Sequence, residues 1–301
     1  MDSAGALTVR ARAPGKIVLS GAYAVLHGAP GLVAAVDRYA LADTARPASF
    51  VTEEVRAALG ERPAPWFDAS ALRDGGQKLG LGSSAAILVA SLGALELERE
   101  PELGSKELAE RVFPVALAAH ATAQGGGSGI DVAASAHGGF LEVRRGAELA
   151  VRPVHLPPEV VVQVLALGHP ASTSELVARV RALAVRDASL HARCMAAQAD
   201  ASERAASAVD RADGAGFVAA LAEQGRALAA LGVAAGASIV TPEIRALQLD
   251  AERAGAAALP SGAGGGDIAL WVSLRGVPVP ERAGLTPISL GLGAAGVERV
   301  P

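Results

Sequence analysis

Runs of apolar residues, separated by glycine and proline, divide the chain into predicted strands and helices. Residues 7–12 alternate apolar and polar positions as a half-buried strand does, and residues 17–19 continue as an extended segment until Gly21. Residues 31–36 form a second apolar run of strand length. Between residues 42 and 77, prolines and paired glycines indicate an irregular segment with an edge hairpin and a surface loop.

Helical patterns follow. The pattern predicts a helix from Ser83 to Glu98, with charges only at its end, so most of its sides should be buried. A second helix is predicted from Glu102 to Ala123, bent at Pro114. Further strands are expected at residues 138–143, 149–154, 160–167, 268–272 and 287–292. Further helices are expected at residues 174–185, 188–212, 214–231 and 242–255.

The order of these elements limits the possible fold classes. Strands and helices alternate without a strict βαβ pattern, which favours an α+β fold over a doubly wound sheet. A cluster of prolines at 153, 157 and 158 indicates a domain boundary near residue 155. The length suits two modest domains, which we expect at residues 1–156 and 157–301.

Composition narrows the class of protein without naming an activity. Hydrophobic residues make up 51% of the 301 residues and charged residues 19%, which excludes a disordered chain. The net charge is −4 and no basic cluster is present, so nucleic acid is not an expected partner. The single cysteine, Cys194, forms no internal disulfide, and no apolar segment has the form of a signal peptide or membrane span. We therefore expect a cytoplasmic protein that binds no membrane.

One glycine-rich segment stands directly before the predicted apolar helix. It reads GLGSSAA from Gly80 to Ala86. Glycines let backbone N–H groups approach a ligand, and a helix N-terminus adds unpaired donors and a partial positive charge, which together suit a phosphate. Ser83 and Ser84 add hydroxyls for phosphate oxygens or a magnesium ion. The alternative is a flexible loop whose serine caps the helix.

Two other glycine-rich segments each carry a carboxylate. Residues 124–131, QGGGSGID, end at Asp131, which could cap a helix or could accept a proton from a substrate and orient a nucleophile. Residues 260–267, PSGAGGGD, precede a predicted strand. They form either an ordinary loop or a place where a ligand or the first glycine loop approaches the backbone closely.

Together the segments resemble three ordered motifs of the GHMP kinase superfamily of small-molecule kinases. The first motif is APGKIVLSGAYAVLHGAP at residues 13–30, the second covers residues 80–86 and the third residues 261–267. Three motifs in order are more specific than a single glycine loop. The resemblance implies a two-domain α+β fold, with a mixed α/β N-terminal domain and a ferredoxin-like C-terminal domain.

Within this superfamily the chain is most similar to bacterial phosphomevalonate kinases. Tyr23 stands where mevalonate kinases usually carry histidine, and Lys78 lies just ahead of the second motif. His120 precedes the glycine segment before Asp131, and residues 171–177 resemble a segment of the same branch. The resemblance implies ATP-dependent phosphorylation of phosphomevalonate in isoprenoid precursor biosynthesis by a monomer or homodimer. Mevalonate, or the acceptor of another kinase in the superfamily, is the alternative.

The resemblance also implies residue roles. Lys16 would stabilise the transferring phosphoryl group, Asp131 would orient the acceptor or act as its base, and Ser84 would bind Mg²⁺. The implied ATP-binding residues are Lys78, Gly80, Leu81, Gly82, Ser83, Ser84 and Ala85. The implied acceptor-binding residues are Lys16, Tyr23, Ser128, Gly129, Ser172, Thr173, Ser261, Gly262, Gly264 and Gly265. The serines and threonine near residue 172 could equally cap the following helix.

Some residues depart from the family pattern. Ala22 replaces the usual glutamate of the first motif, and the glycine stretch before Asp131 lacks a common lysine. Leu259 and Pro260 stand where a basic residue often precedes the third motif. A catalytically silent ligand sensor of the same fold would fit such changes, whereas the presence of Lys16 and Asp131 favours an enzyme.

Overall fold

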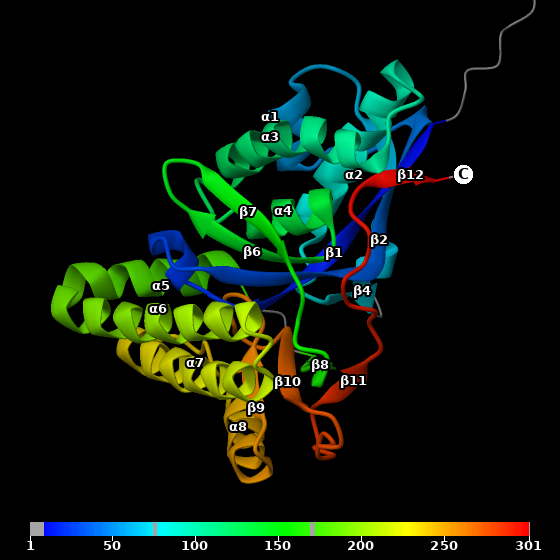
Figure 1. The fold of residues 1–301 in the computed structure, drawn as a ribbon. Coiled ribbons are helices and arrows are strands. Elements are labelled where there is room, and N and C mark those ends of the chain that lie inside the picture. The colour runs from blue at the N-terminus through cyan, green and yellow to red at the C-terminus, as the bar shows by residue number, and fades with distance from the viewer. Residues whose placement is uncertain (1–8, 75–76, 169–171, 301) are drawn as a thin grey trace, which may run out of the picture. The chain divides into compact units, whose positions relative to one another are not determined.

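The computed structural model describes residues 9–74, 77–168 and 172–300 (Figure 1). Its contacts separate two compact units. Unit 1 comprises the chain up to Ile17, residues 34–141 and residues 291–301, and unit 2 comprises residues 18–33 and 142–290. The chain passes from one unit to the other inside strands β1 (Arg10–Ser20) and β2 (Gly31–Pro47), so each unit is described by itself.

Unit 1 combines strands with the helices around the second glycine motif. Its helices are α1 (Glu53–Leu59), α2 (Ser83–Arg99), α3 (Ser105–Gln124) and α4 (Ile130–His137). Its strands are the first part of β1, most of β2, β3 (Pro65–Asp68), β4 (Arg73–Asp74), β5 (Gln77–Lys78) and β12 (Glu298–Val300). The antiparallel register of β1 and β12 pairs Arg10 with Val300 and Arg12 with Glu298. The first and last described strands are therefore neighbours.

Helix α2 is the buried centre of unit 1. Its described neighbours include α1, α3 and α4, and Figure 1 shows α3 lying beside it. Leu88 and Leu97 are fully buried, and burying each such side chain contributes about 1.5–3 kcal/mol. At Gly93 a Cβ would lie 2.7 Å from Val297 Cγ2, so glycine permits close packing against the C-terminal segment. The predicted helix over residues 83–98 is thus confirmed, with burial on most sides.

Part of the segment over residues 42–77 is regular, contrary to expectation. Strand β2 continues to Pro47, and the helix α1 follows it. Thr52 caps α1 by accepting a hydrogen bond from the Val55 N–H at 3.3 Å, and Gly60 ends the helix. The sequence analysis missed this helix because the neighbouring prolines favoured an irregular segment, although Thr52 and Gly60 are typical residues for a helix start and a helix end. The predicted hairpin corresponds to β4 and β5.

Unit 2 contains a sheet with helices packed on it. Its strand order is β11-β8-β10-β9, and each neighbouring pair is antiparallel. The strands of this sheet are β8 (Val160–Ala166), β9 (Ala257–Pro260), β10 (Ile268–Leu274) and β11 (Thr286–Ile288). The helices are α5 (Thr173–Arg186), α6 (Ala188–Asp210), α7 (Gly214–Ala235) and α8 (Pro242–Ala254). Unit 2 also holds β7 (Leu149–Val154), most of β6 (Phe140–Arg145) and the turn η1 (Ala24–His27).

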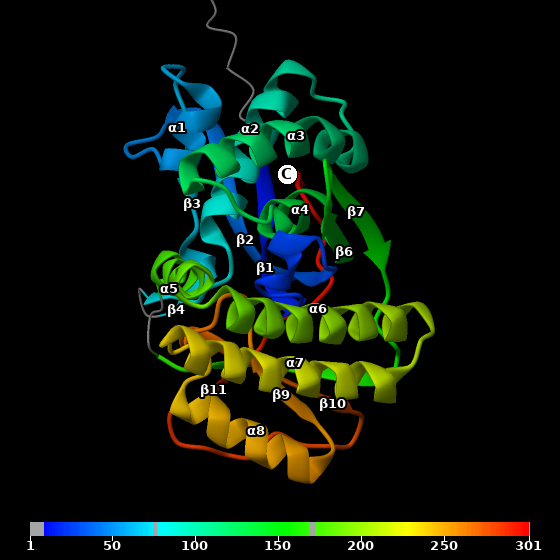
Figure 2. The same ribbon diagram turned by 90° about the vertical axis from the view of Figure 1, so that its left-hand side faces the viewer.

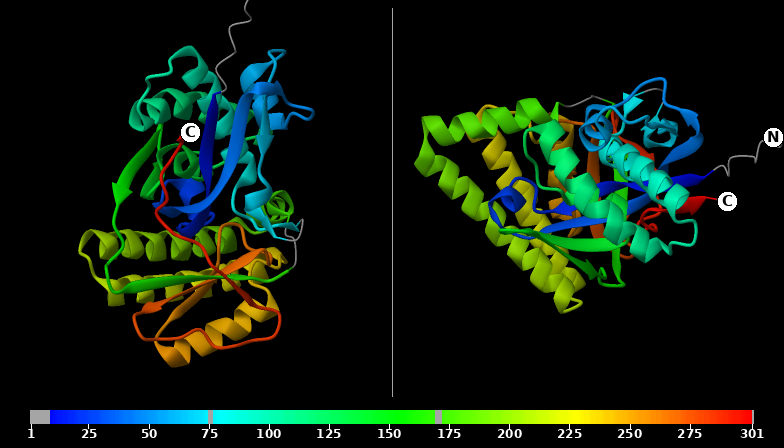
Figure 3. Two further views of the ribbon diagram at one scale, coloured as in Figure 1. Left: turned by 90° about the vertical axis from the view of Figure 1, so that its right-hand side faces the viewer. Right: turned by 90° about the horizontal axis from the view of Figure 1, so that it is seen from above.

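The helices and the sheet of unit 2 form separate layers. Figure 2 shows α6 and α7 side by side, with α8 on the other side of α7, and the left-hand view in Figure 3 brings the strands in front. Trp271 of β10 packs with Ile244 and Leu247 of α8 in one apolar cluster. A second cluster joins α5, α6 and α7 to Tyr23 and its neighbours. This mixture of sheet and helix confirms the α+β class.

Four further details concern the predicted elements and domains. The strand expected at residues 287–292 is confirmed only in part: β11 covers Thr286–Ile288, and it is not the last strand, because β12 follows it. A wider sheet has the order β12-β1-β2-β6-β7 with β3 paired to β2, so the expected strand pair β6 and β7 is confirmed. Among the described helices, α7 alone has the length and hydropathy of a membrane span, but half of its most apolar 18-residue stretch is buried inside the protein. The boundary at residues 156 and 157 remains a prediction.

Candidate active site

The glycine loop before α2 is shaped by left-handed backbone. Gly80 and Gly82 have φ values of 67° and 74°, a conformation that favours glycine. Gly82 is the N-cap of α2, and among the residues that the structure describes no side chain caps the helix. A serine cap, the alternative from the sequence, is therefore not what begins α2. Ser83 and Ser84 stand at the first two positions of the helix, with their hydroxyls outside the capping role.

Lys16 forms two hydrogen bonds with this loop. Its backbone N–H donates to the Leu81 carbonyl at 2.8 Å, and its Nζ donates to the Gly80 carbonyl at 3.1 Å. The preceding Gly15 permits this approach, because a Cβ there would lie 2.7 Å from the Leu81 carbonyl oxygen. The first motif thus delivers a lysine to the second motif within unit 1.

Asp131 lies in the first turn of α4. The helix begins after Gly129, whose φ of 75° again favours glycine, and Asp131 Oδ1 accepts from the Val132 N–H at 3.0 Å. Asp131 Oδ2 lies 3.4 Å from His120 Nε2 on α3, and the His120 side chain is buried. Since the N-cap is a glycine, the helix-cap alternative for Asp131 is not observed. Its carboxylate is instead held between two helices.

Gly82 is the point where these groups meet. A Cβ placed on Gly82 would lie 3.1 Å from Lys16 Cγ and Cε and 3.7 Å from Asp131 Cβ. The lysine, the glycine loop and the aspartate, which the sequence spreads over more than a hundred positions, therefore surround one backbone position. A helix N-terminus, a cation and a carboxylate in this arrangement suit the transfer of an anionic group.

Glu54 is a fourth polar group at this place, and the sequence reasoning missed it. It lies on α1 with 5% of its surface exposed, and its Oε1 accepts from Gln124 Nε2 at 2.7 Å. Burial alone would raise the pKa of the Glu54 carboxyl, but hydrogen bonds from its own backbone, Gln124, Thr52 and Ser84 outweigh burial and lower it. The signal available in the sequence was an acidic residue in the first turn of the missed helix α1.

The oxygen donors around the loop fit a hard divalent cation. Ser84 offers a hydroxyl, and Asp131 and Glu54 offer carboxylates, which are the donor types that Mg²⁺ prefers. Within the described ranges, no group of three or more His, Cys, Asp or Glu side chains could hold a metal ion. An ion here would complete its coordination with phosphate oxygens and water, as magnesium does in nucleotide sites.

Tyr23 and the third motif are joined within unit 2. The buried Tyr23 hydroxyl donates to the Ala263 carbonyl at 2.7 Å, and Tyr23 adopts a φ of 62°, which is rare for a side chain of this size. Ser261 Oγ accepts from the Val18 N–H at 2.9 Å. The third motif therefore stabilises the first motif through side-chain and backbone contacts.

The glycines of the third motif have a packing reason. At Gly264, where φ is 86°, a Cβ would lie 2.3 Å from the Ile239 carbonyl oxygen. Gly265 donates its N–H to that same oxygen at 3.0 Å. Gly262 also has a positive φ, of 71°, and lies beside Val18. Contact of Ser261 and these three glycines with an acceptor remains a prediction.

The remaining expected site residues are placed as follows. Ser128 Oγ accepts from the Ile130 N–H at 3.4 Å, in the loop before α4. Ser172 caps α5 by accepting from the Glu175 N–H at 3.3 Å, and Thr173 is the exposed first residue of that helix. The capping alternative is thus observed for Ser172. The Lys78 backbone belongs to β5, but its side chain lies outside the described parts of the chain.

Replacing Tyr23 with phenylalanine tests the bond between the two motifs. Tyr23→Phe should lower the free energy of unfolding at neutral pH by about 1 kcal/mol, the usual value of a hydrogen bond. Burial raises the pKa of the Tyr23 phenol, so the folded protein keeps this proton where the unfolded chain loses it above about pH 10. The wild-type advantage should therefore be constant below pH 10 and shrink above it.

Urea unfolding of both proteins between pH 7 and pH 11 measures this difference. Tyr39→Phe is the matched control, because Tyr39 is the only other tyrosine and is half-buried. Burial also raises the pKa of Tyr39, but a cation, Arg12, opposes the shift. A difference between wild type and Tyr23→Phe that stays constant up to pH 11 would contradict the role given to the buried hydroxyl.

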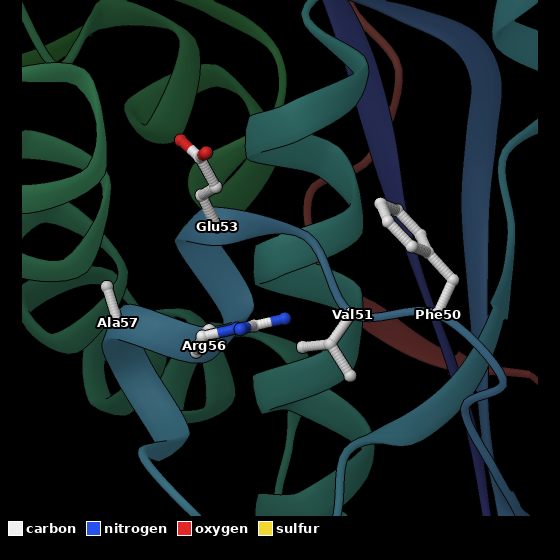
Figure 4. A pocket seen from close by; sticks show the side chains of 5 residues that line it. All are labelled: Phe50, Val51, Glu53, Arg56 and Ala57. Carbon is white, nitrogen blue, oxygen red and sulfur yellow. The ribbon is translucent and has the colours of Figure 1, made fainter.

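A separate pocket of about 550 Å³ opens beside α1. Figure 4 shows Glu53, Arg56 and Ala57 on the helix and Phe50 and Val51 on the segment before it. The Phe50 side chain is 68% exposed. These lining residues are distinct from the predicted site residues, although Glu53 directly precedes Glu54.

Several known kinases are similar to this chain in sequence or in fold. Residues 54–139 match the family model described as the GHMP kinases N terminal domain. A phosphomevalonate kinase of Streptomyces sp. (strain CL190) is 29% identical over 87% of this chain and 89% of its own length. A mevalonate kinase of Thermococcus sibiricus is 30% identical over 58% of this chain and 62% of its own. The structure of Streptococcus pneumoniae phosphomevalonate kinase in complex with phosphomevalonate and AMPPNP aligns with a TM-score of 0.72 at 17% identity, covering 98% of this chain and all (100%) of that one.

Proposed function

Because this chain belongs to the GHMP kinase superfamily, we propose that it transfers the terminal phosphoryl group of ATP to phosphomevalonate, a step of the mevalonate pathway. The observation that carries the proposal is the meeting of Lys16, the glycine loop and Asp131 around Gly82. The more extensive of the two sequence similarities described above is to a phosphomevalonate kinase, and this favours the phosphorylated acceptor.

The N-terminus of α2 would receive the ATP phosphates. Gly80 and Gly82 keep side chains away from the loop, so its backbone N–H groups can approach phosphate oxygens. Lys16 would neutralise charge on the group in transfer, from a position fixed by its bond to the Gly80 carbonyl. Bound magnesium would offset phosphate charge, held by Ser84 and the nearby carboxylates.

Asp131 would orient the acceptor. A phosphate monoester has a second pKa near 6, so an acceptor phosphate is already largely ionised at neutral pH. A strong base is then unnecessary, and the carboxylate acts through position and charge. His120, 3.4 Å from Asp131 Oδ2, would keep that carboxylate in place.

The acceptor is tested by offering the purified protein mevalonate and phosphomevalonate separately with MgATP. ADP release and the phosphorylated product should be found with phosphomevalonate, at a kcat/KM at least about a hundredfold above that for mevalonate, which corresponds to about 2.7 kcal/mol of discrimination. Asp131→Asn serves as the negative control for contaminating kinases.

Each other outcome assigns the chain differently. Preference for mevalonate would make it a mevalonate kinase, in line with the similarity to the Thermococcus enzyme. ADP release with neither acceptor, but with another small-molecule alcohol, would move it to another branch of the superfamily. ATP binding with no transfer to any acceptor would indicate the ligand sensor to which the Ala22 replacement points.

A further inference from the structure

Ser135 interrupts a run of alanines in α4 and is fully buried. Alanine is the better helix former, and a buried hydroxyl is costly unless it forms a hydrogen bond. The Ser135 hydroxyl does form one, because its Oγ donates to the Pro14 carbonyl, 121 positions earlier, at 2.9 Å. The serine therefore links α4 to strand β1 inside unit 1.

The two ends of this hydrogen bond lie close in sequence to two residues of the candidate site. Ser135 follows Asp131 by four residues, so both lie on the same face of α4, about 6 Å apart along the helix axis. Pro14 precedes Lys16 by two residues, which is about 7 Å along an extended strand. The bond therefore attaches the helix that carries Asp131 to the strand that carries Lys16.

Lys16 has its own attachment to the glycine loop. Its N–H donates to the Leu81 carbonyl and its Nζ donates to the Gly80 carbonyl. Residues 14–16 consequently bond to the glycine loop at one position and to α4 at another. Without the Ser135 hydroxyl, Lys16 and the loop would stay joined, whereas α4 would lose this hydrogen bond to the strand that carries Lys16.

We infer that Ser135 is a positioning residue, which sets the location of Asp131 relative to Lys16 and the glycine loop for phosphoryl transfer. This inference rests on the proposed function, because it takes Asp131 to orient the acceptor. Displacing a reacting group by about 1 Å can slow a reaction by up to about a hundredfold. The buried Ser135 thus acts on the reaction through the place that it gives to Asp131.

Removing the hydroxyl tests this role. Ser135→Ala should lower kcat by about tenfold, because α4 can shift relative to β1, while the dissociation constant for ADP stays within about twofold of wild type. Helix α4 should stay folded, since the Val297 N–H also donates to the Ala136 carbonyl at 3.1 Å. Initial rates with the acceptor that wild type prefers, calorimetry with ADP and melting temperatures measure these effects.

Ser91→Ala is the matched control. Ser91 lies in α2 and is also fully buried, and its hydroxyl has no hydrogen-bond partner among the residues that the structure describes. The substitution removes the same atom from the interior of unit 1 without breaking a bond between elements of the site. Its kcat should stay within about twofold of wild type.

A double variant shows whether Ser135 acts through Asp131. In that case, adding Ser135→Ala to Asp131→Ala should lower kcat by less than about twofold further, because the carboxylate that the serine positions is already gone. A purely structural contribution would lower kcat by the same factor in both backgrounds. Single-turnover reactions at high enzyme concentration measure the low rates of the Asp131 variants.

The outcomes separate the inference from the proposed function. A wild-type kcat for Ser135→Ala overturns the inference and leaves the kinase proposal intact. So does an equal loss of kcat with and without Asp131, and so does a loss of ADP affinity that parallels the loss of kcat. Phosphoryl transfer by wild type to no acceptor at all overturns the proposed function and the inference together.

Discussion

Replacing Asp131 with alanine should lower kcat by about 10²–10³-fold, the usual cost of removing one preorganised electrostatic group from an active site. Asp131 lies at the start of α4, within the cluster around Gly82, so the loss falls on the reacting groups. Its side chain is one-quarter exposed and contacts His120 on α3 and the adjacent Val132 N–H, so the fold should survive. Initial rates at saturating ATP and acceptor, together with the melting temperature, measure both effects.

Asp200→Asn is a suitable comparison for the Asp131 variants. Asp200 is an exposed residue of α6, so its loss removes a carboxylate without touching the site. Its rate should equal that of wild type within about twofold, as expected for an ordinary surface substitution. A near-wild-type rate for Asp131→Ala would remove Asp131 from the catalytic machinery and with it the mechanism proposed above.

Replacing Gly82 with valine should weaken ATP binding by at least about a hundredfold, or about 2.7 kcal/mol. Two causes add. Gly82 has a φ of 74°, where a β-branched residue is strained, and its Cβ would lie 3.1 Å from two carbons of Lys16. The valine would also occupy space that the phosphates need at the start of α2. Fluorescent nucleotide titration measures the loss.

Gly255 provides the control for backbone strain alone. It has nearly the same conformation, with φ 68° and ψ 30° against 74° and 37° at Gly82, and it ends α8. No described atom lies within 4 Å of the Cβ position at Gly255. Gly255→Val should therefore lower the melting temperature while ATP affinity stays unchanged. Equal ATP affinity in both variants would contradict the assignment of the phosphate loop.

The parts of the site that the sequence predicted are those carried by short-range patterns. The glycine loop before an apolar run predicts the N-terminus of α2, and the glycine segment at residues 124–131 predicts the turn before Asp131. That Lys16 joins them followed only from the resemblance to a family, because periodicity says nothing about which distant segments meet. The structure brings all three to one backbone position.

The parts that escaped prediction depend on contacts between distant residues. Thr52 and Gly60 marked the ends of α1, yet what matters about Glu54 is its approach to Gln124, seventy positions away. Ser261 behaves similarly: its hydroxyl accepts from Val18, 243 positions earlier. No local sequence pattern distinguishes a serine hydroxyl that binds a ligand from one that accepts a hydrogen bond from a strand N–H.

The pairing of β1 with β12 has a consequence for how the protein is made. A chain leaving the ribosome usually folds its N-terminal region first. Here residues 10–12 can pair with residues 298–300 only after these have been synthesised, and they are the last to be made among the residues described. Unit 1 therefore stays incomplete until residues 298–300 have been synthesised, and nascent β1 exposes an unpaired edge until then. Factors that shield emerging strands should matter more for this protein than for one whose first strand pairs with a neighbour in sequence.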